Sequence, residues 1–458
     1  MQRQHGQQQQ QQQQQKETTP HQQLQLQQLE PAAIQTHIAS KVRSLQYCIG
    51  GMVIGLSMLL PQNQPIVAEI MTHASPVKVG SFVAKTASFG SFVEFLINPL
   101  CGALGDKYGR RPIILFAFST TAVLRAVAFV NSRSLPIVGI TLVVTRALDT
   151  VLITATRAAL SDMLSGEQLA FALPKIATAA GLAIMFGPPI SLGITRLTGS
   201  HTLPLLAASV VSALCAYTVY TKLDETLPPS RSRDLTWRTA NPFAFVEVLT
   251  SSATMAKLMS VSLVQTFVDQ RSIADTAMSF QQSQLGWTRE ESGQYVVAAG
   301  VKIVLGGIIG KQLIKYMGLR NITSWSNGIN SLVAALFATI PHYSIYILFF
   351  GMLGDRKRDG VESMLTDIGT TGKGFGRGRI ASALFNWRSL ANIIAPLLYN
   401  SLFQWGLGKK KATGVQYFAS SHQLACLSCS LIAEMIYRSI PSSDIDGAVA
   451  INEKKKQK

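Results

Sequence analysis

Several charged side chains lie inside long apolar stretches of this sequence, where a charge is costly unless it does chemistry or is paired. Ser91, Glu94 and Asn98 recur at helical spacing in one such stretch, so they share one helix face. A carboxylic acid away from water is held near its neutral form and can exchange a proton near neutral pH. Glu94 is therefore a candidate proton carrier, and pairing with an arginine of a neighbouring helix is the structural alternative.

A second polar face lies in the stretch 135–160, where Arg146, Asp149 and Arg157 share one side with Ile153. Asp149 is close enough in sequence to neutralise Arg146 locally. Charges inside membrane helices usually face the bundle interior or a water-filled cavity. The later stretches carry further candidates for substrate contact or interhelical pairing, namely Asp269, Arg271, Asp275, Lys302, Arg388, Asn392 and Glu434. Arg271 and Asp275 are one turn apart and can neutralise each other.

The elements that must position these residues are apolar runs of membrane-spanning length. The chain has 458 residues, of which 47% are hydrophobic and 14% charged, whereas soluble domains carry about 25% charged residues. This predicts an all-α polytopic membrane protein with about 12 transmembrane helices in two six-helix bundles. The runs cover about 45–60, 79–104, 113–130, 135–160, 170–194, 203–220, 255–280, 293–313, 322–340, 344–365, 380–405 and 415–440.

The composition also divides the chain into segments. Residues 1–43 form a Gln-rich segment that cannot bury a core and is predicted to be a disordered cytoplasmic tail. The first bundle is expected at 44–221, a cytoplasmic linker at 222–253, the second bundle at 254–440 and a basic cytoplasmic tail at 441–458. No signal peptide is expected, because the first apolar run follows a long polar segment.

The net charge of +17 would suit nucleic acid, but the cations cluster in loops between apolar runs. Membrane orientation explains them better, so no nucleic-acid partner is expected. The pair Cys426 and Cys429 lies on a predicted membrane helix, where this spacing more often marks a small-residue face than a metal or redox site. Neither a metal nor a cofactor is expected, and without a nucleophile elbow or phosphate loop an enzyme is not expected either.

A charged hairpin joins the second and third apolar runs, with the sequence Gly102-Ala-Leu-Gly-Asp106-Lys107-Tyr-Gly109-Arg110-Arg111. Gly109 permits a sharp turn, the cations favour the cytoplasmic side, and Asp106 can cap a helix or pair with an arginine. The pattern G-x-x-x-D-K-x-G-R-R resembles the signature loop between helices 2 and 3 of the major facilitator superfamily, with every signature position filled.

This resemblance implies two parallel halves that rock around a central cavity. Gly318 aligns with Gly109 in a worn second copy of the loop, which puts Lys315 opposite Asp106. In similar transporters an aspartate at the position of Asp162 pairs with the loop arginine, here Arg110, and locks one end of the first half. The resemblance also places Arg146 where related antiporters keep an arginine tied to proton transfer.

Two further motifs bear on the branch of the superfamily. The fifth helix is expected to be kinked by Gly187, Pro188 and Pro189. This segment matches only part of the glycine-rich motif of drug antiporters. The eleventh run, with Ser389-Leu390 and Pro396-Leu397-Leu398, resembles tetracycline-resistance efflux proteins and their relatives. Those proteins usually carry a carboxylate in the first helix, and 45–60 has none, so Glu94 or Asp149 would have to carry the proton.

The cation distribution favours cytoplasmic termini, with the run Lys409-Lys410-Lys411 as the exception. The segment Asp355-Arg356-Lys357-Arg358-Asp359 would lie at mid-membrane in an unbroken tenth helix. Either that helix breaks near Gly354, or the charges line a cavity that suits an anionic substrate.

We expect a monomeric secondary transporter of a small organic solute in a lipid bilayer, coupled to protons. One alternative is a transporter-like receptor or scaffold without flux. The other is an organic-anion facilitator that uses Arg356, Lys357, Arg388 and Lys302.

Overall fold

The structure is a computed structural model that describes residues 42–72, 74–163, 166–227, 241–372, 375 and 377–441. Within these ranges the chain is helical and has no strand. The Gln-rich tail up to residue 41, the linker centre at 228–240 and the basic tail from residue 442 lie outside the described residues.

The first half forms long, regular helices that follow the apolar runs. They are Val42–Leu59, α4 (Pro76–Tyr108), α5 (Arg110–Val130), α6 (Leu135–Met163), α7 (Gly166–Thr198) and α8 (Leu203–Lys222), with a short extra helix α3 (Asn63–Ile70) that the sequence did not predict. Helix α4 begins where the Ser75 hydroxyl accepts a hydrogen bond from the Lys78 amide at 3.4 Å. It ends at Gly109, whose φ of +104° suits a residue without a Cβ.

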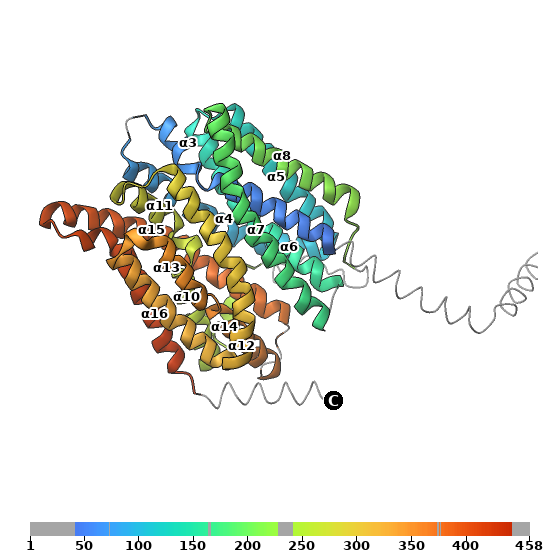
Figure 1. Cartoon of the computed structure of the whole chain (residues 1–458). Helices are drawn as coiled ribbons and strands as arrows, with labels where there is room; N and C mark the ends of the chain where they lie inside the picture. Colours follow the sequence, from blue (N-terminus) through green and yellow to red (C-terminus); the bar gives the residue numbers. More distant parts are fainter. Residues whose placement is uncertain are drawn as a thin grey trace, which may run out of the picture.

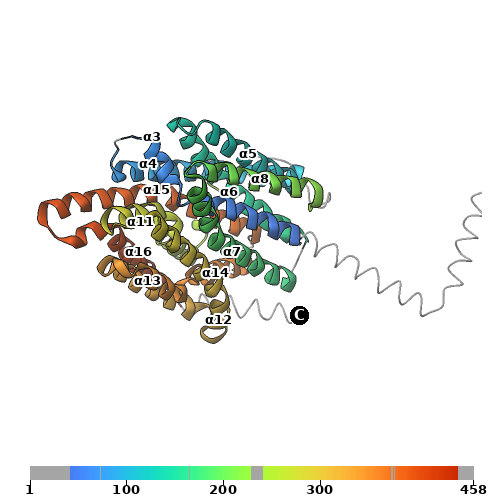
Figure 2. The ribbon, with the colours of Figure 1, turned by 45° about the horizontal axis from the view of Figure 1, so that its top comes forward.

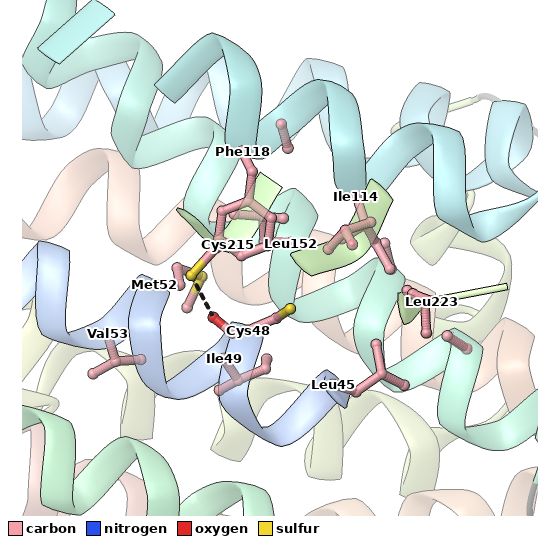
Figure 3. Close-up of a cluster of buried hydrophobic side chains, with 14 of the residues drawn as sticks. Leu45, Cys48, Ile49, Met52, Val53, Ile114, Phe118, Leu152, Cys215 and Leu223 are labelled. Atoms are coloured by element: carbon pink, nitrogen blue, oxygen red, sulfur yellow. Dashed lines mark hydrogen bonds between the residues drawn. The ribbon is translucent and has the colours of Figure 1, made fainter. Parts of the chain in front are cut away.

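The core of the first half joins the first helix to α5, α6 and α8. Leu45, Cys48 and Met52 pack against Phe118 of α5 and Leu152 of α6 (Figure 3). The Cys215 thiol of α8 points to the Cys48 carbonyl at 3.9 Å. These side chains pair apolar faces across four helices, which is how a bundle without a sheet closes its interior.

The second half is built from divided helices. After α9 (Phe245–Leu249) the seventh span is split into α10 (Ala253–Phe267) and α11 (Gln270–Gln284). Helix α12 (Arg289–Thr339) contains the eighth and ninth predicted spans, which meet at Gly318 with φ +73°. The tenth consists of α13 (Ser344–Phe350), a 3-10 turn η3 (Gly351–Gly354) and α14 (Lys357–Gly372), followed by α15 (Arg377–Thr413), η4 (Gln416–Ser420) and α16 (Ser421–Arg438).

The tenth span therefore breaks at Gly354, the first of the two alternatives the sequence left open. Side chains bind the carbonyl groups that the break exposes. Asn330 donates to the Gly354 carbonyl at 2.8 Å and Gln265 to the Lys357 carbonyl at 3.2 Å. A broken helix is tolerated inside a membrane where its backbone groups find such partners.

Seven of the described helices are long and apolar enough to cross a membrane, or up to eight if the pair Arg320–Thr339 and Pro341–Gly369, bent by 120°, counts as one span. The other predicted spans are divided or polar. Helices α10 and α11 have 15 residues each, and the 18 residues of α16 include several hydroxyl groups, a histidine and a glutamate. The described helices are nevertheless consistent with the predicted all-α fold of about 12 transmembrane helices.

The two halves lie side by side. The blue-to-green helices gather on one side of the molecule and the yellow-to-red helices on the other (Figure 1), and Figure 2 shows the same division from a second direction. Two helix pairs form most of the contact between them, α4 with α15 and α7 with α12. We call the end of the bundle that carries Asp106–Arg111 the loop end, and the other the far end.

The last turns of α15 extend past the other helices at the far end, where the hairpin to α16 projects in both views (Figures 1 and 2). Lys410 and Lys411 lie in its last turn, and Lys410 donates a hydrogen bond to the Gln284 side chain at 2.8 Å. The run Lys409-Lys410-Lys411, the exception to the cation distribution, thus lies at the far end of the bundle, away from the charged loop.

Candidate transport site

The interface between α4 and α15 holds polar contacts along its length. Asn400 donates to the Ser81 hydroxyl at 3.3 Å near the far end, and the Ser88 hydroxyl donates to the Ile393 carbonyl. Deeper in, the Ser389 hydroxyl donates to Glu94 at 3.4 Å. Glu94 is fully buried. The carboxylate therefore lies at the contact between halves, with a partner on the opposite half.

Arg146 of α6 packs against the polar face of α4 that carries Ser91 and Glu94. Its Nε donates to the Ser91 hydroxyl at 3.3 Å, and its side chain packs on Gly90, where a Cβ would lie 3.0 Å from the arginine Cδ. Arg146 also interacts electrostatically with Asp275 of α11, in the second half. Glu94 and Arg146 thus both connect the first half to the second.

The first half contains another buried arginine, Arg125, between α5 and α8, which the sequence analysis did not identify. Arg125 of α5 is 1% exposed and donates to the Ser212 hydroxyl at 2.8 Å and the Ala208 carbonyl at 3.4 Å. Asp149, which is 6% exposed, interacts with it electrostatically. Asp149 therefore has Arg125 as a charge partner, in addition to its expected proximity to Arg146. As a lone cation in the third apolar run, Arg125 could have been found by the rule applied to the other runs.

The second half gathers its charges at the two helix breaks. Asp269, at the start of α11, forms ion pairs with Lys357 at 3.6 Å and with Arg358. Lys302 of α12 pairs with Asp355 at 2.8 Å, and Arg356 pairs with Asp359 at 2.7 Å. Arg388 of α15 pairs with Glu362 of α14 at 3.1 Å and donates to Ser262 at 2.7 Å. We call these nine charged residues the joint cluster.

The charged loop closes the first half at the loop end. The Arg110 guanidinium lies between two carboxylates, pairing with Asp106 and, at 3.1 Å, with Asp162 of α6. Arg111 donates to the Tyr220 carbonyl at 2.7 Å, while Lys107 lies over the Tyr108 ring. Gly102 lines a cavity of about 20 Å³ beside Asn98, whose buried side-chain oxygen has no hydrogen-bond partner in the part of the chain that the structure describes.

Glu225 gives this loop a partner that the sequence analysis did not assign. Its carboxylate accepts hydrogen bonds from the amides of Arg110 at 2.8 Å and Arg111 at 3.2 Å, at the start of α5. An anion at a helix N-terminus satisfies free amides and the helix dipole. A Cβ on Gly109 would collide with this carboxylate, so turn geometry and packing both require glycine.

The remaining candidates are more scattered. Glu434 accepts from Asn327 at 3.0 Å and pairs with Arg438 at 2.6 Å, whereas Asn392 is buried and Arg157 is exposed. The Arg271 side chain lies outside those the structure describes. Helix α7 continues through Pro188 and Pro189. Gly187 contacts Ser57 of the first helix, and the expected kink stays a prediction.

In the described part of the chain, no group of three or more His, Cys, Asp or Glu side chains could hold a metal ion.

The chain matches a family model, that of the Major Facilitator Superfamily, over residues 47–398. The chain belongs to the major facilitator superfamily. Members of this superfamily are membrane transporters and not enzymes, so the protein is a multi-pass secondary transporter.

Solved structures of other major facilitators share this fold. The human organic anion transporter MFSD10 (TETRAN) is 15% identical, with 87% of this chain and 99% of that chain covered at a TM-score of 0.66. A D-xylose-proton symporter is 12% identical, with 88% and 98% covered at a TM-score of 0.68. A mutant of the nucleoside transporter NupG is 12% identical, with 87% and 99% covered at a TM-score of 0.65. At these identities the likeness concerns the fold.

Proposed function

We propose that this major facilitator couples the transport of a small organic solute to protons, with Glu94 as the proton carrier. The observation that supports it is the fully buried Glu94 carboxylate, which accepts a hydrogen bond from Ser389 across the contact between the halves. A neutral Glu94 would bind its polar partners less strongly than an ionised one.

The position of Glu94 suggests how a proton would act on the two halves. Alternating access requires that contacts between α4 and α15 form in one state and break in the other. Protonation of Glu94 weakens one such contact and changes the balance of charge beside Arg146. Asp275, which interacts electrostatically with Arg146 from the second half, would feel the same change.

The charged loop would hold the loop end of the first half together during this motion. Arg110, paired with Asp106 and Asp162, connects α5 to α4 and α6. Two pairings on one guanidinium favour a single arrangement of these three helices. We propose that this lock persists in one access state and loosens in the other.

The same proposal includes the branch of the superfamily, the transport mode, the orientation of the termini and the oligomeric state. The motif at Ser389-Leu390 and Pro396-Leu397-Leu398 supports a position near the tetracycline-resistance and drug-efflux branch, with antiport as the mode. The loop cations support cytoplasmic termini. A monomer agrees with a fold in which both halves come from one chain.

The test is flux into proteoliposomes that hold the purified full-length protein. A panel of cationic drugs, organic anions and sugars is supplied with an imposed pH gradient and then with a protonophore. We expect the native protein to show flux that the protonophore abolishes. In Glu94→Gln the flux should no longer depend on the pH gradient. Glu69→Gln, which changes a half-exposed carboxylate, is the matched control and should behave as the native protein.

Coupled flux in Glu94→Gln would remove Glu94 as the carrier, and flux that persists with the protonophore would favour a facilitator. Ligand binding without flux under any gradient would favour the receptor or scaffold alternative.

A further inference from the structure

The joint cluster carries more positive than negative charge. Among the described residues its cations are Lys302, Arg356, Lys357, Arg358 and Arg388, and its carboxylates are Asp269, Asp355, Asp359 and Glu362. Five cations against four carboxylates leave one positive charge uncompensated. The cluster is partly buried, with Lys357 only 8% exposed, and an excess of positive charge in such surroundings attracts an anion.

Two arginines of the cluster lie along one face of α10. Arg388 donates to Ser262 at 2.7 Å, and Arg358 donates to Thr266 at 3.4 Å. Ser262 and Thr266 are one helical turn apart, about 5–6 Å. The two guanidinium groups are close enough for their charges to repel each other, and a carboxylate between them would relieve that repulsion.

The arginines also keep unused hydrogen-bonding capacity. Nε of Arg358 and Nη2 of Arg388 are buried and have no hydrogen-bond partner among the described residues, so they face the protein interior and not open solvent. A guanidinium offers five N–H donors in a planar fork that matches a carboxylate. The Arg358 side chain is 35% exposed, so a solute can reach it.

Glu362 occupies the position that such a carboxylate would take. It pairs with Arg388 at 3.1 Å and interacts with Arg358 electrostatically, from the next turn of α14. Its side chain is 44% exposed, in contrast to the 16% of Arg388. A half-exposed side chain can leave its partner at small cost, because exposed ion pairs contribute little.

We infer that Arg358 and Arg388 form the binding site for the carboxylate group of an organic anion, and that Glu362 is an internal competitor which the solute displaces. That the bound anion is the transported solute rests on the proposed function. The site lies where the broken seventh and tenth spans meet α15, so occupancy of the site links three spans of the second half.

The test measures binding of benzoate to the purified full-length protein by calorimetry, without any gradient. Benzamide, its neutral counterpart, and phenyl phosphate are compared. We expect millimolar or tighter benzoate binding, no benzamide binding, and loss of benzoate binding in Arg358→Gln and Arg388→Gln. Arg133→Gln removes an exposed cation from a loop of the first half and should bind normally.

The sign of a fourth variant separates this site from a structural ion pair. Glu362→Gln removes the competitor and should tighten benzoate binding about fivefold, whereas loss of a structural pair would weaken it. Arg388→Lys keeps the charge without the fork and should bind weakly, which keeps the test informative if Arg388→Gln does not fold.

Benzoate binding that is absent from the native protein, that persists in both glutamine variants, or that weakens in Glu362→Gln would overturn the inference. Tighter binding of phenyl phosphate than of benzoate would overturn the carboxylate assignment. Benzoate binding is measured without a gradient and flux with one, so the two failures are distinguishable. A native protein that binds benzoate but shows no protonophore-sensitive flux would contradict proton coupling, whereas coupled flux without benzoate binding would contradict this site.

Discussion

The two halves of this transporter place their charges in opposite ways. In the first half unbroken helices carry the spans, and the signature charges lie in the last turn of α4 and the first turn of α5, where Arg110 pairs with Asp106 and with Asp162 of α6. In the second half the charges lie at helix breaks inside the bundle, around Asp269 and Glu362. A charge at a helix end keeps some access to water, whereas a charge at an internal break depends on other side chains.

This contrast suggests different tasks for the halves. The loop contacts of the first half hold helices together at one end, and the exposed side chains of the joint cluster are open to an incoming group. Glu94 accepts a hydrogen bond from Ser389 of the second half, and Arg146 interacts electrostatically with Asp275 of that half. We expect mutations to separate the three regions by the size and kind of their effect.

The largest effect on stability is expected at Asp269. Asp269→Ala leaves Lys357, only 8% exposed, without its ion-pair partner, and an uncompensated buried charge costs about 3–5 kcal/mol. Thermal unfolding in detergent measures the change. Asp359→Ala is the matched control, since its side chain is 47% exposed and should cost under about 1 kcal/mol. Equal effects of the two would contradict a buried role for Asp269.

Arg125 tests whether the first half also depends on an internal charge. Arg125→Met keeps much of the side-chain volume but leaves Asp149 and Ser212 without this partner, at an expected cost of about 2–3 kcal/mol. Thermal unfolding is again the measurement. Arg125→Met with Asp149→Asn should recover part of the loss, and a double variant less stable than the sum of the single ones would refute the coupling.

Arg110 and Asp162 test the lock at the loop end. Both side chains are 11% exposed, and a double-mutant cycle with Arg110→Gln and Asp162→Asn should give a coupling energy of about 1–2 kcal/mol. Accessibility of an engineered cysteine at the loop end, measured by labelling rate, should rise in either single variant. Independent effects with no change in labelling would show that the pair does not act as a lock.

The smallest expected effect is the difference in stability between two glycine variants, one in the turn of each half. Gly109→Ala and Gly318→Ala both place a Cβ at positive φ, which costs about 1–2 kcal/mol. A Cβ at Gly109 would also meet Glu225, while at Gly318 it would have no neighbour within 4 Å among the described residues. Gly109→Ala should therefore unfold at the lower temperature, and the reverse order would show that Glu225 gives way easily.

Much of the fold could be predicted from apolar run length. The runs at 113–130 and 203–220 agree with α5 and α8 within three residues at each end. The break of the seventh span at Asp269 could not be predicted from run length, because the predicted run 255–280 has about the length of one membrane helix. The turn between the eighth and ninth spans lies at Gly318, where the backbone leaves the helical region, at the position that the alignment with Gly109 predicts.

The candidate site divides in the same way. The signature loop and the buried carboxylates could be found by type and spacing. Two partnerships could not: that of Ser389 with Glu94, 295 positions apart in the sequence, and that of Glu225 with the amides of α5. No local pattern links such residues, since they meet only when the helices pack.

The apolar runs of about twenty residues predict a helical membrane protein, and the signature loop carries the resemblance to the major facilitators. The residues that carry charge inside those runs can also be read from the sequence. Which charges meet across helices depends on the tertiary structure, because such an ion pair requires a particular rotation and depth of two helices. The joint cluster, with its surplus cation and half-exposed Glu362, arises from that packing.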